Sequence, residues 1–174
     1  MKTKKVKNPG TSSFDTISTA TADPLIMAKF HFFGAVSASF TPFLTKYQTD
    51  RPMLPFLIKD LSDLLKSLMK RFVKKEHQET SAVRISQINV TDKAIWASDN
   101  AVDVGLGADL EIKALKRNGT IGDLTVKKFR KDCMKKLSLI CKKILDKSPL
   151  KFPLARQMCC LDPTICLVLL MPAE

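Results

Sequence analysis

Apolar residues recur at steps of three and four in two long segments, and this periodicity constrains the fold more than any other feature of the sequence. In the segment 55–79 the stripe consists of Leu57, Leu61, Leu64, Leu65, Leu68 and Phe72. In the segment 121–147 it consists of Val126, Phe129, Cys133, Leu137, Ile140 and Ile144. Such a period puts the apolar side chains on one face of an α-helix, and that face needs a covering element. The pattern predicts two amphipathic helices in one core, the second preceded by a capping-box spacing, Thr120-x-x-Asp123.

An earlier segment is apolar on nearly every side. Asp23-Pro24 suits a helix start, because Asp accepts hydrogen bonds from free backbone amides and Pro fits the first turn. From residue 24 to about residue 40 the apolar residues include three Phe within positions 30–33. This pattern is typical of a helix buried among other helices. Pro42 is predicted to kink or restart it, and the apolar surface continues to Tyr47.

The stretch from 80 to 119 is different, since short apolar and polar alternation is punctuated by Gly105, Gly107 and Gly119. Short strands and extended loop are both compatible with alternation this brief. A short helix is predicted at about 109–117, ending at Asn118-Gly119. The predicted fold class is mainly α: an irregular helical bundle with an extended or short-stranded excursion around 80–119.

A chain of 174 residues, 45% hydrophobic and 26% charged, fits one domain with its own core. We expect residues 1–23 to form a disordered basic arm, because this stretch has too few apolar residues to offset chain entropy. Residues 24–174 are then a single helical domain. Lys4, Lys5 and Lys7 have the form of a short nuclear-import signal, and a solvated charged tail is the equal alternative. The expected location is nuclear or cytoplasmic.

The segment 165–171 consists of seven apolar residues. A membrane span needs about 20 such residues, so no membrane partner is expected. The segment is either a buried element of this fold, or the domain 24–174 is a fragment of a larger fold. We favour the second interpretation, because the first and last ordered segments are both apolar and have no polar face to turn to water.

No reaction centre is evident. The spacing of the five Cys and two His does not fit a zinc site, and five Cys in an intracellular chain are expected to be reduced thiols. His31 and His77 are interpreted as structural residues. Asp103, in an apolar stretch, would need further carboxylate partners to bind Mg²⁺ as a nuclease does. We therefore expect no enzyme activity, no metal and no cofactor.

Positive charge is the strongest functional signal. The formal net charge is +12, and the segment 123–147 holds nine Lys or Arg and three Asp, a net of +6. Cations grouped beside a buried stripe favour contact with the phosphate backbone of DNA, independent of base sequence. A solvated face that keeps the protein soluble is the alternative. The predicted DNA-binding residues are Lys127, Lys128, Arg130, Lys131, Lys135, Lys136, Lys142 and Lys143.

Four phrases suggest a family. They are FLTKYQTDRPMLPFL at 43–57, LSDLLKSLMKRFV at 61–73, Ser148-Pro149-Leu150 and Leu161-Asp162-Pro163. They resemble the middle portion of proteins derived from hAT-type DNA transposases, including domesticated and catalytically decayed members, over residues 29–166. The resemblance implies a mostly helical region inserted in or beside a ribonuclease-H-like core. No residue here matches the family's Asp-Asp-Glu trio, and the family's BED-type zinc finger has no counterpart.

The sequence thus predicts a non-catalytic, transposase-derived nuclear protein that contacts DNA backbone through a Lys-rich helix. The alternative is a protein-interaction or oligomerisation module. In that case the apolar segment 165–171 and the Phe-rich first helix would bind a full-length transposase-like relative, a second copy or another protein.

Overall fold

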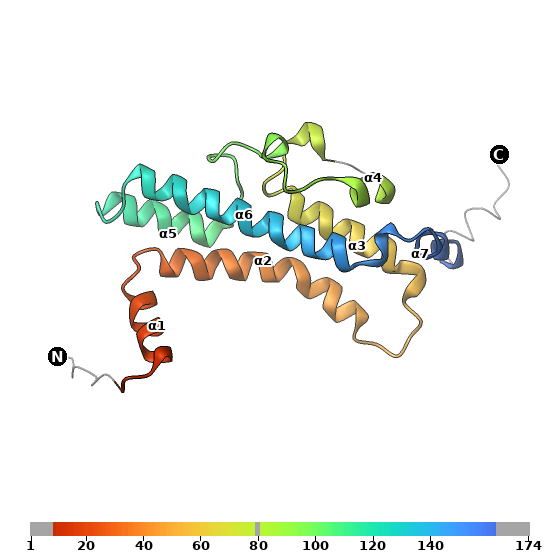
Figure 1. Cartoon of the computed structure of the whole chain (residues 1–174), viewed down its shortest axis with the longest axis horizontal. Coiled ribbons are helices and arrows are strands. Elements are labelled where there is room, and N and C mark those ends of the chain that lie inside the picture. The colour runs from red at the N-terminus through yellow and green to blue at the C-terminus, as the bar shows by residue number, and fades with distance from the viewer. Residues whose placement is uncertain (1–8, 79–80, 163–174) are drawn as a thin grey trace.

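The chain is mainly α-helical, as predicted. The computed structural model describes residues 9–78 and 81–162. Along these residues Figure 1 shows α-helices joined by turns and short 3₁₀ segments. The described residues form no β-strand, and Val73 and Trp96 form an isolated antiparallel bridge. The helices are α1 Ser12–Thr21, α2 Ile26–Tyr47, α3 Leu54–Met69, α4 Ala82–Gln87, α5 Leu106–Arg117, α6 Asp123–Lys147 and α7 Pro153–Gln157.

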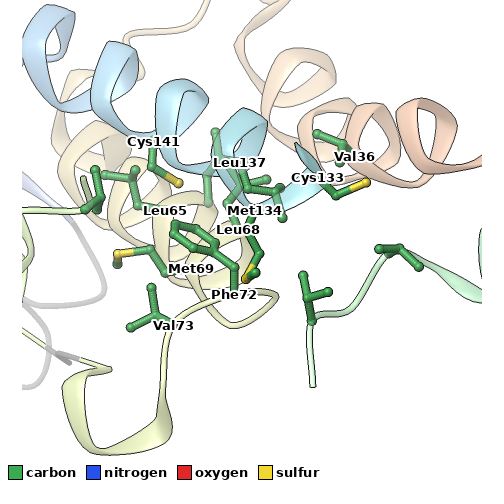
Figure 2. Packing of buried hydrophobic residues seen from close by; sticks show 14 of the residues in the cluster. Val36, Leu65, Leu68, Met69, Phe72, Val73, Cys133, Met134, Leu137 and Cys141 are labelled. Atoms are coloured by element: carbon green, nitrogen blue, oxygen red, sulfur yellow. The ribbon is translucent and has the colours of Figure 1, made fainter. Parts of the chain in front are cut away.

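The core forms between α3 and α6, the two helices that the apolar periodicity predicted. Figure 2 shows Met134 and Leu137 of α6 pointing toward Leu68 and Phe72. Most of the predicted stripe residues of both helices are buried, whereas Leu57, Val126, Ile140 and Ile144 are half-buried at its edges. Burial of this apolar surface is the main force that holds the two helices together.

Two predicted boundaries differ from the structure. Helix α3 ends at Met69, ten residues before the predicted end, because the next backbone groups bond elsewhere: the amide of Ala97 donates to the carbonyl of Phe72 at 2.7 Å. Phe72 remains fully buried in the turn after the helix. The predicted capping box before α6 is wrong, since Gly122 is the N-cap and makes no side-chain cap bond.

Helix α2 is the largest departure from the predicted packing. It continues through Pro42 to Tyr47, and Figure 1 shows its axis bending over its second half. Only Ala28 and Val36 are buried, so the expectation of a helix surrounded by others is wrong. The phenylalanines at 30 and 33 are exposed because one side of α2 has no neighbour among the described residues.

The excursion at 80–119 is irregular and helical, without strands in its described part. Gly105 has φ +89° and an ideal Cβ there would lie 2.6 Å from Cβ of Ala35, so the chain can enter α5 beside α2 only with glycine at this position. The predicted helix at 109–117 is confirmed and begins slightly earlier, at Leu106.

The predicted disordered arm is wrong over 12–21, where α1 forms. Thr11 accepts a hydrogen bond from the amide of Phe14 at the helix start, and no residue of α1 is buried. Local capping therefore stabilises a helix that contributes nothing to the core. Lys4, Lys5 and Lys7, like the apolar segment 165–171, lie outside the described residues.

Candidate functional site

Helix α6 carries the predicted DNA-binding residues and presents most of them to solvent. Its buried side, which includes Phe129, Cys133, Leu137 and Cys141, fixes the orientation of the helix. Seven lysines therefore lie on the opposite, exposed side, which we call the basic face. The basic face consists of Lys127, Lys128, Lys131, Lys135, Lys136, Lys142 and Lys143.

Few of these lysines have a carboxylate partner. Nζ of Lys131 lies 3.5 Å from Asp99, and Nζ of Lys135 lies 3.1 Å from Asp132 one turn earlier. Pairs this exposed contribute little stability, typically below about 1 kcal/mol. Among the described residues, no carboxylate lies within 4 Å of the other five lysines of the basic face. Their positive charge is available to an external anion.

Arg130 does not belong to the basic face. Its Nη2 donates to Oδ1 of Asp109 at 2.6 Å, and its Nη1 donates to the carbonyl oxygen of Asn100 at 3.0 Å. Only 16% of the side chain is exposed. The guanidinium thus joins α6 to α5 and to the preceding turn, so we remove Arg130 from the candidate interface.

The composition of the exposed side of α6 limits what it can recognise. The exposed residues of α6 include three aspartates, Asp123, Asp132 and Asp146, and two leucines, Leu124 and Leu139, but no aromatic residue. Base stacking by single strands needs aromatic side chains, and bidentate recognition of guanine favours Arg. Lysines alone favour contacts with phosphate.

A second feature, an apolar groove between α2 and α6, was not predicted from the sequence. Its volume is about 720 Å³. Phe32, Phe33, Val36 and Phe40 line it from α2, and α6 contributes Phe129, Cys133 and Ile140. Two lysines of the basic face, Lys128 and Lys136, also line this groove. Only the Phe-rich composition of 30–40 pointed to such a surface, and sequence alone did not show that the side chains would be left uncovered.

The remaining candidate residues do not converge on a reaction centre. The side chain of His31 lies against Gly107 at the start of α5, where an added Cβ would lie 2.8 Å from its Nδ1. His77 is exposed, with Nε2 3.6 Å from Glu76. Asp103 lies 3.8 Å from Arg71, and its Oδ1 accepts a bond from the amide of Gly105. No three His, Cys, Asp or Glu side chains in the described part of the chain are grouped so that they could hold a metal ion.

The thiols of Cys133 and Cys141 in α6 are not activated as nucleophiles. Burial raises the pKa of Cys133 to about 12, and the negative charge of Asp132 adds to this effect. Burial also raises the pKa of Cys141 to about 12. A nucleophilic cysteine needs a lowered pKa, so both residues act as small apolar groups of the core.

Within residues 9–78 and 81–162, no helix combines the length and apolar character that crossing a membrane would require. Comparison with family models, curated proteins and solved structures found no match to this chain. The similarity to hAT-type transposases stays a prediction from the four sequence phrases.

Proposed function

We propose that the chain is a non-catalytic protein of hAT-transposase descent that contacts the phosphate backbone of DNA through the basic face of α6. The observation that supports this proposal is the row of seven exposed lysines along α6, five of which have no carboxylate partner among the described residues. From Lys127 to Lys143 the helix rises by about 24 Å, at about 1.5 Å per residue. This length equals about seven base-pair steps of B-DNA, which is enough for about five phosphate contacts.

The energetics of such a contact are those of counterion release. Like charges on neighbouring turns repel one another in the free protein, and a polyanion relieves this repulsion. Each neutralised phosphate releases condensed cations, so the logarithm of the binding constant falls with the logarithm of salt concentration by about 0.9 per contact. Five contacts give a slope of about −4.5.

Fluorescence anisotropy with a labelled duplex of mixed sequence, titrated at several salt concentrations, tests the proposal. We expect a steep slope that falls by about 3 to 4 units when four lysines of the basic face become glutamine. The test variant carries Lys127→Gln, Lys131→Gln, Lys135→Gln and Lys142→Gln. The control variant, with the same change in net charge at exposed lysines outside α6, carries Lys59→Gln, Lys70→Gln, Lys75→Gln and Lys93→Gln. Equal slopes for the two variants would contradict the proposal.

Nuclear localisation belongs to the same proposal, with Lys4, Lys5 and Lys7 as the import signal. A fluorescent fusion of the full chain should accumulate in the nucleus and lose this preference when the three lysines become alanine. If the variant fusion is distributed in the cell like the unaltered one, Lys4, Lys5 and Lys7 are not a nuclear-import signal.

A protein-interaction module is the second proposed function, and one observation favours it. Phe30 and Phe33 of α2 are 62% and 70% exposed, which leaves large apolar groups in water. Exposed apolar clusters are typical of interaction surfaces. Sedimentation velocity of the chain should show association that is weakened by Phe30→Ser combined with Phe33→Ser, or by deletion of 165–171. A monomer that is unaffected by either change would count against self-association.

A further inference from the structure

The groove between α2 and α6 has the length of a short helix. The residues that line it on the α2 side extend from Leu25, the N-cap of α2, to Phe40, and those of α6 extend from Thr125 to Ile140. Fifteen residues of α-helix rise by about 22 Å, which is about four turns. Figure 1 shows α2 and α6 running in the same direction along this length, so the two helices form parallel walls.

The floor of the groove is apolar and its edge is open. Val36, Phe129 and Cys133 are at most 5% exposed and form the bottom. Phe33, on the edge contributed by α2, is 70% exposed. An apolar surface that is both concave and open gains free energy when an apolar side chain enters it and displaces water.

The charges along the groove do not cancel. Asp23 accepts a hydrogen bond from Nζ of Lys29, and Asp132 is paired with Lys135. Lys128 and Lys136 line the α6 side, and neither has a carboxylate within 4 Å among the described residues. The unmatched charge on this side is therefore positive, and it complements an acidic partner.

We propose that the groove binds an amphipathic α-helix of another protein, with apolar residues at positions i, i+3, i+4 and i+7 and with Asp or Glu on the flank that faces α6. This inference rests on the second proposed function and gives it a site and a partner chemistry. Apolar anchors enter the groove between Phe33 and Ile140, and the acidic flank pairs with Lys128 and Lys136. The arrangement is the helix-in-groove mode of recognition, with charge setting specificity and apolar burial setting affinity.

Two designed peptides of about 16 residues serve as probes for the full chain. Both have the same Leu positions at i, i+3, i+4 and i+7, but one carries Glu on its flanks and the other carries Lys. Fluorescence anisotropy should show that the Glu peptide binds at least about tenfold more tightly than the Lys peptide. Lys128→Glu combined with Lys136→Glu should reverse this preference, whereas Lys142→Glu combined with Lys143→Glu, on the same helix beyond the groove, should preserve it.

A matched pair of phenylalanines tests the apolar contact. Phe33→Ser should weaken binding of the Glu peptide by at least about tenfold, because Phe33 lines the groove. Phe30→Ser removes a similarly exposed ring that does not line it and should leave binding unchanged. Equal effects of the two substitutions would overturn the proposal.

Other occupants give distinct results. If deletion of 163–174 strengthens peptide binding at least tenfold, the chain's own segment occupies the groove and the proposal is overturned. Concentration-dependent dimerisation that Phe33→Ser abolishes, without any peptide binding, would assign the groove to a second copy. This last result would support the protein-interaction function but contradict the proposal that the partner is an acidic helix.

Discussion

Nη2 of Arg130 donates to Oδ1 of Asp109 across the boundary between α6 and α5, at 2.6 Å. The same guanidinium donates through Nη1 to the carbonyl oxygen of Asn100 at 3.0 Å. Arg130 thus links α6 to other elements through two hydrogen bonds, whereas the lysines of the basic face are exposed. The difference is decided by the position of each residue relative to the buried stripe.

Arg130→Met should lower the free energy of unfolding by about 1.5–3 kcal/mol, because Asp109 loses a charge-assisted hydrogen bond in a half-buried setting. Urea unfolding followed by the fluorescence of Trp96, the single Trp of the chain, measures the change. Lys131→Met, at an exposed position on the same helix, should change the stability by less than about 0.5 kcal/mol. Equal losses would show that Arg130 acts only as a surface charge.

Leu137 and Leu139 are close neighbours on α6 with opposite environments. Leu137 is fully buried, whereas Leu139 is 52% exposed. Leu137→Ala should cost about 2.7–5 kcal/mol of unfolding free energy, since it leaves a cavity between α3 and α6. Leu139→Ala should stay within about 0.5 kcal/mol in the same urea titration. A larger loss at Leu139 would mean that the described orientation of α6 is wrong.

Two glycines that contact α2 or lie in it should respond oppositely to alanine. Gly105→Ala should destabilise the protein by about 2 kcal/mol or more, because φ is +89° and the new Cβ would lie 2.6 Å from Ala35. Gly34→Ala should stabilise it by about 0.5–1 kcal/mol, because nothing lies within 4 Å of the new Cβ and Ala favours a helix. Thermal unfolding of the two variants should therefore show melting temperatures shifted in opposite directions. A shift in the same direction would contradict this description of α2.

The buried thiols should make stability depend on alkaline pH. Burial raises the pKa of Cys133 and Cys141 from 9.0 to about 12, so the folded protein holds these protons where the unfolded chain releases them. The free energy of unfolding should therefore fall as pH rises from about 9 to about 12. Cys133→Ala combined with Cys141→Ala should reduce that fall in urea titrations at a series of pH values.

Thiol labelling gives an independent check on the same residues. With a thiol reagent and mass spectrometry of the native protein, the exposed Cys160 should be modified well before Cys133 and Cys141. Unfolding in urea should abolish the difference. Rapid native labelling of Cys133 or Cys141 would contradict their burial.

Local pattern predicted the helices that bury one face, because amphipathic periodicity alone determines which side of α3 and α6 is covered. The apolar pattern also predicted that α2 is a helix, but not that it is exposed. Apolar residues on every side of a helix favour its burial, but they do not show that other elements are present to cover it. Helix α1 was not predicted, because it is stabilised by local contacts and not by burial. We expected disorder because this stretch has few apolar residues to bury, whereas Thr11 caps the amide of Phe14 and stabilises the start of the helix locally.

The candidate interface was predictable only in part. The exposed lysines of α6 followed from the buried stripe, but the partner of Arg130 lies on another helix, and no helical spacing connects residues 109 and 130. The groove depends on α2 and α6 lying alongside each other, although about 100 residues separate them in the chain. Such a surface is a property of packing, which a single sequence does not encode in its local patterns.

Lys128 and Lys136 lie at the boundary between the basic face and the groove, so both proposed ligands draw on the same two charges. When a DNA phosphate is bound to the ammonium group of Lys128 or Lys136, that lysine can no longer pair with a carboxylate of an acidic helix. We therefore expect the two proposed ligands to compete, so that duplex DNA in excess displaces the peptide without entering the groove.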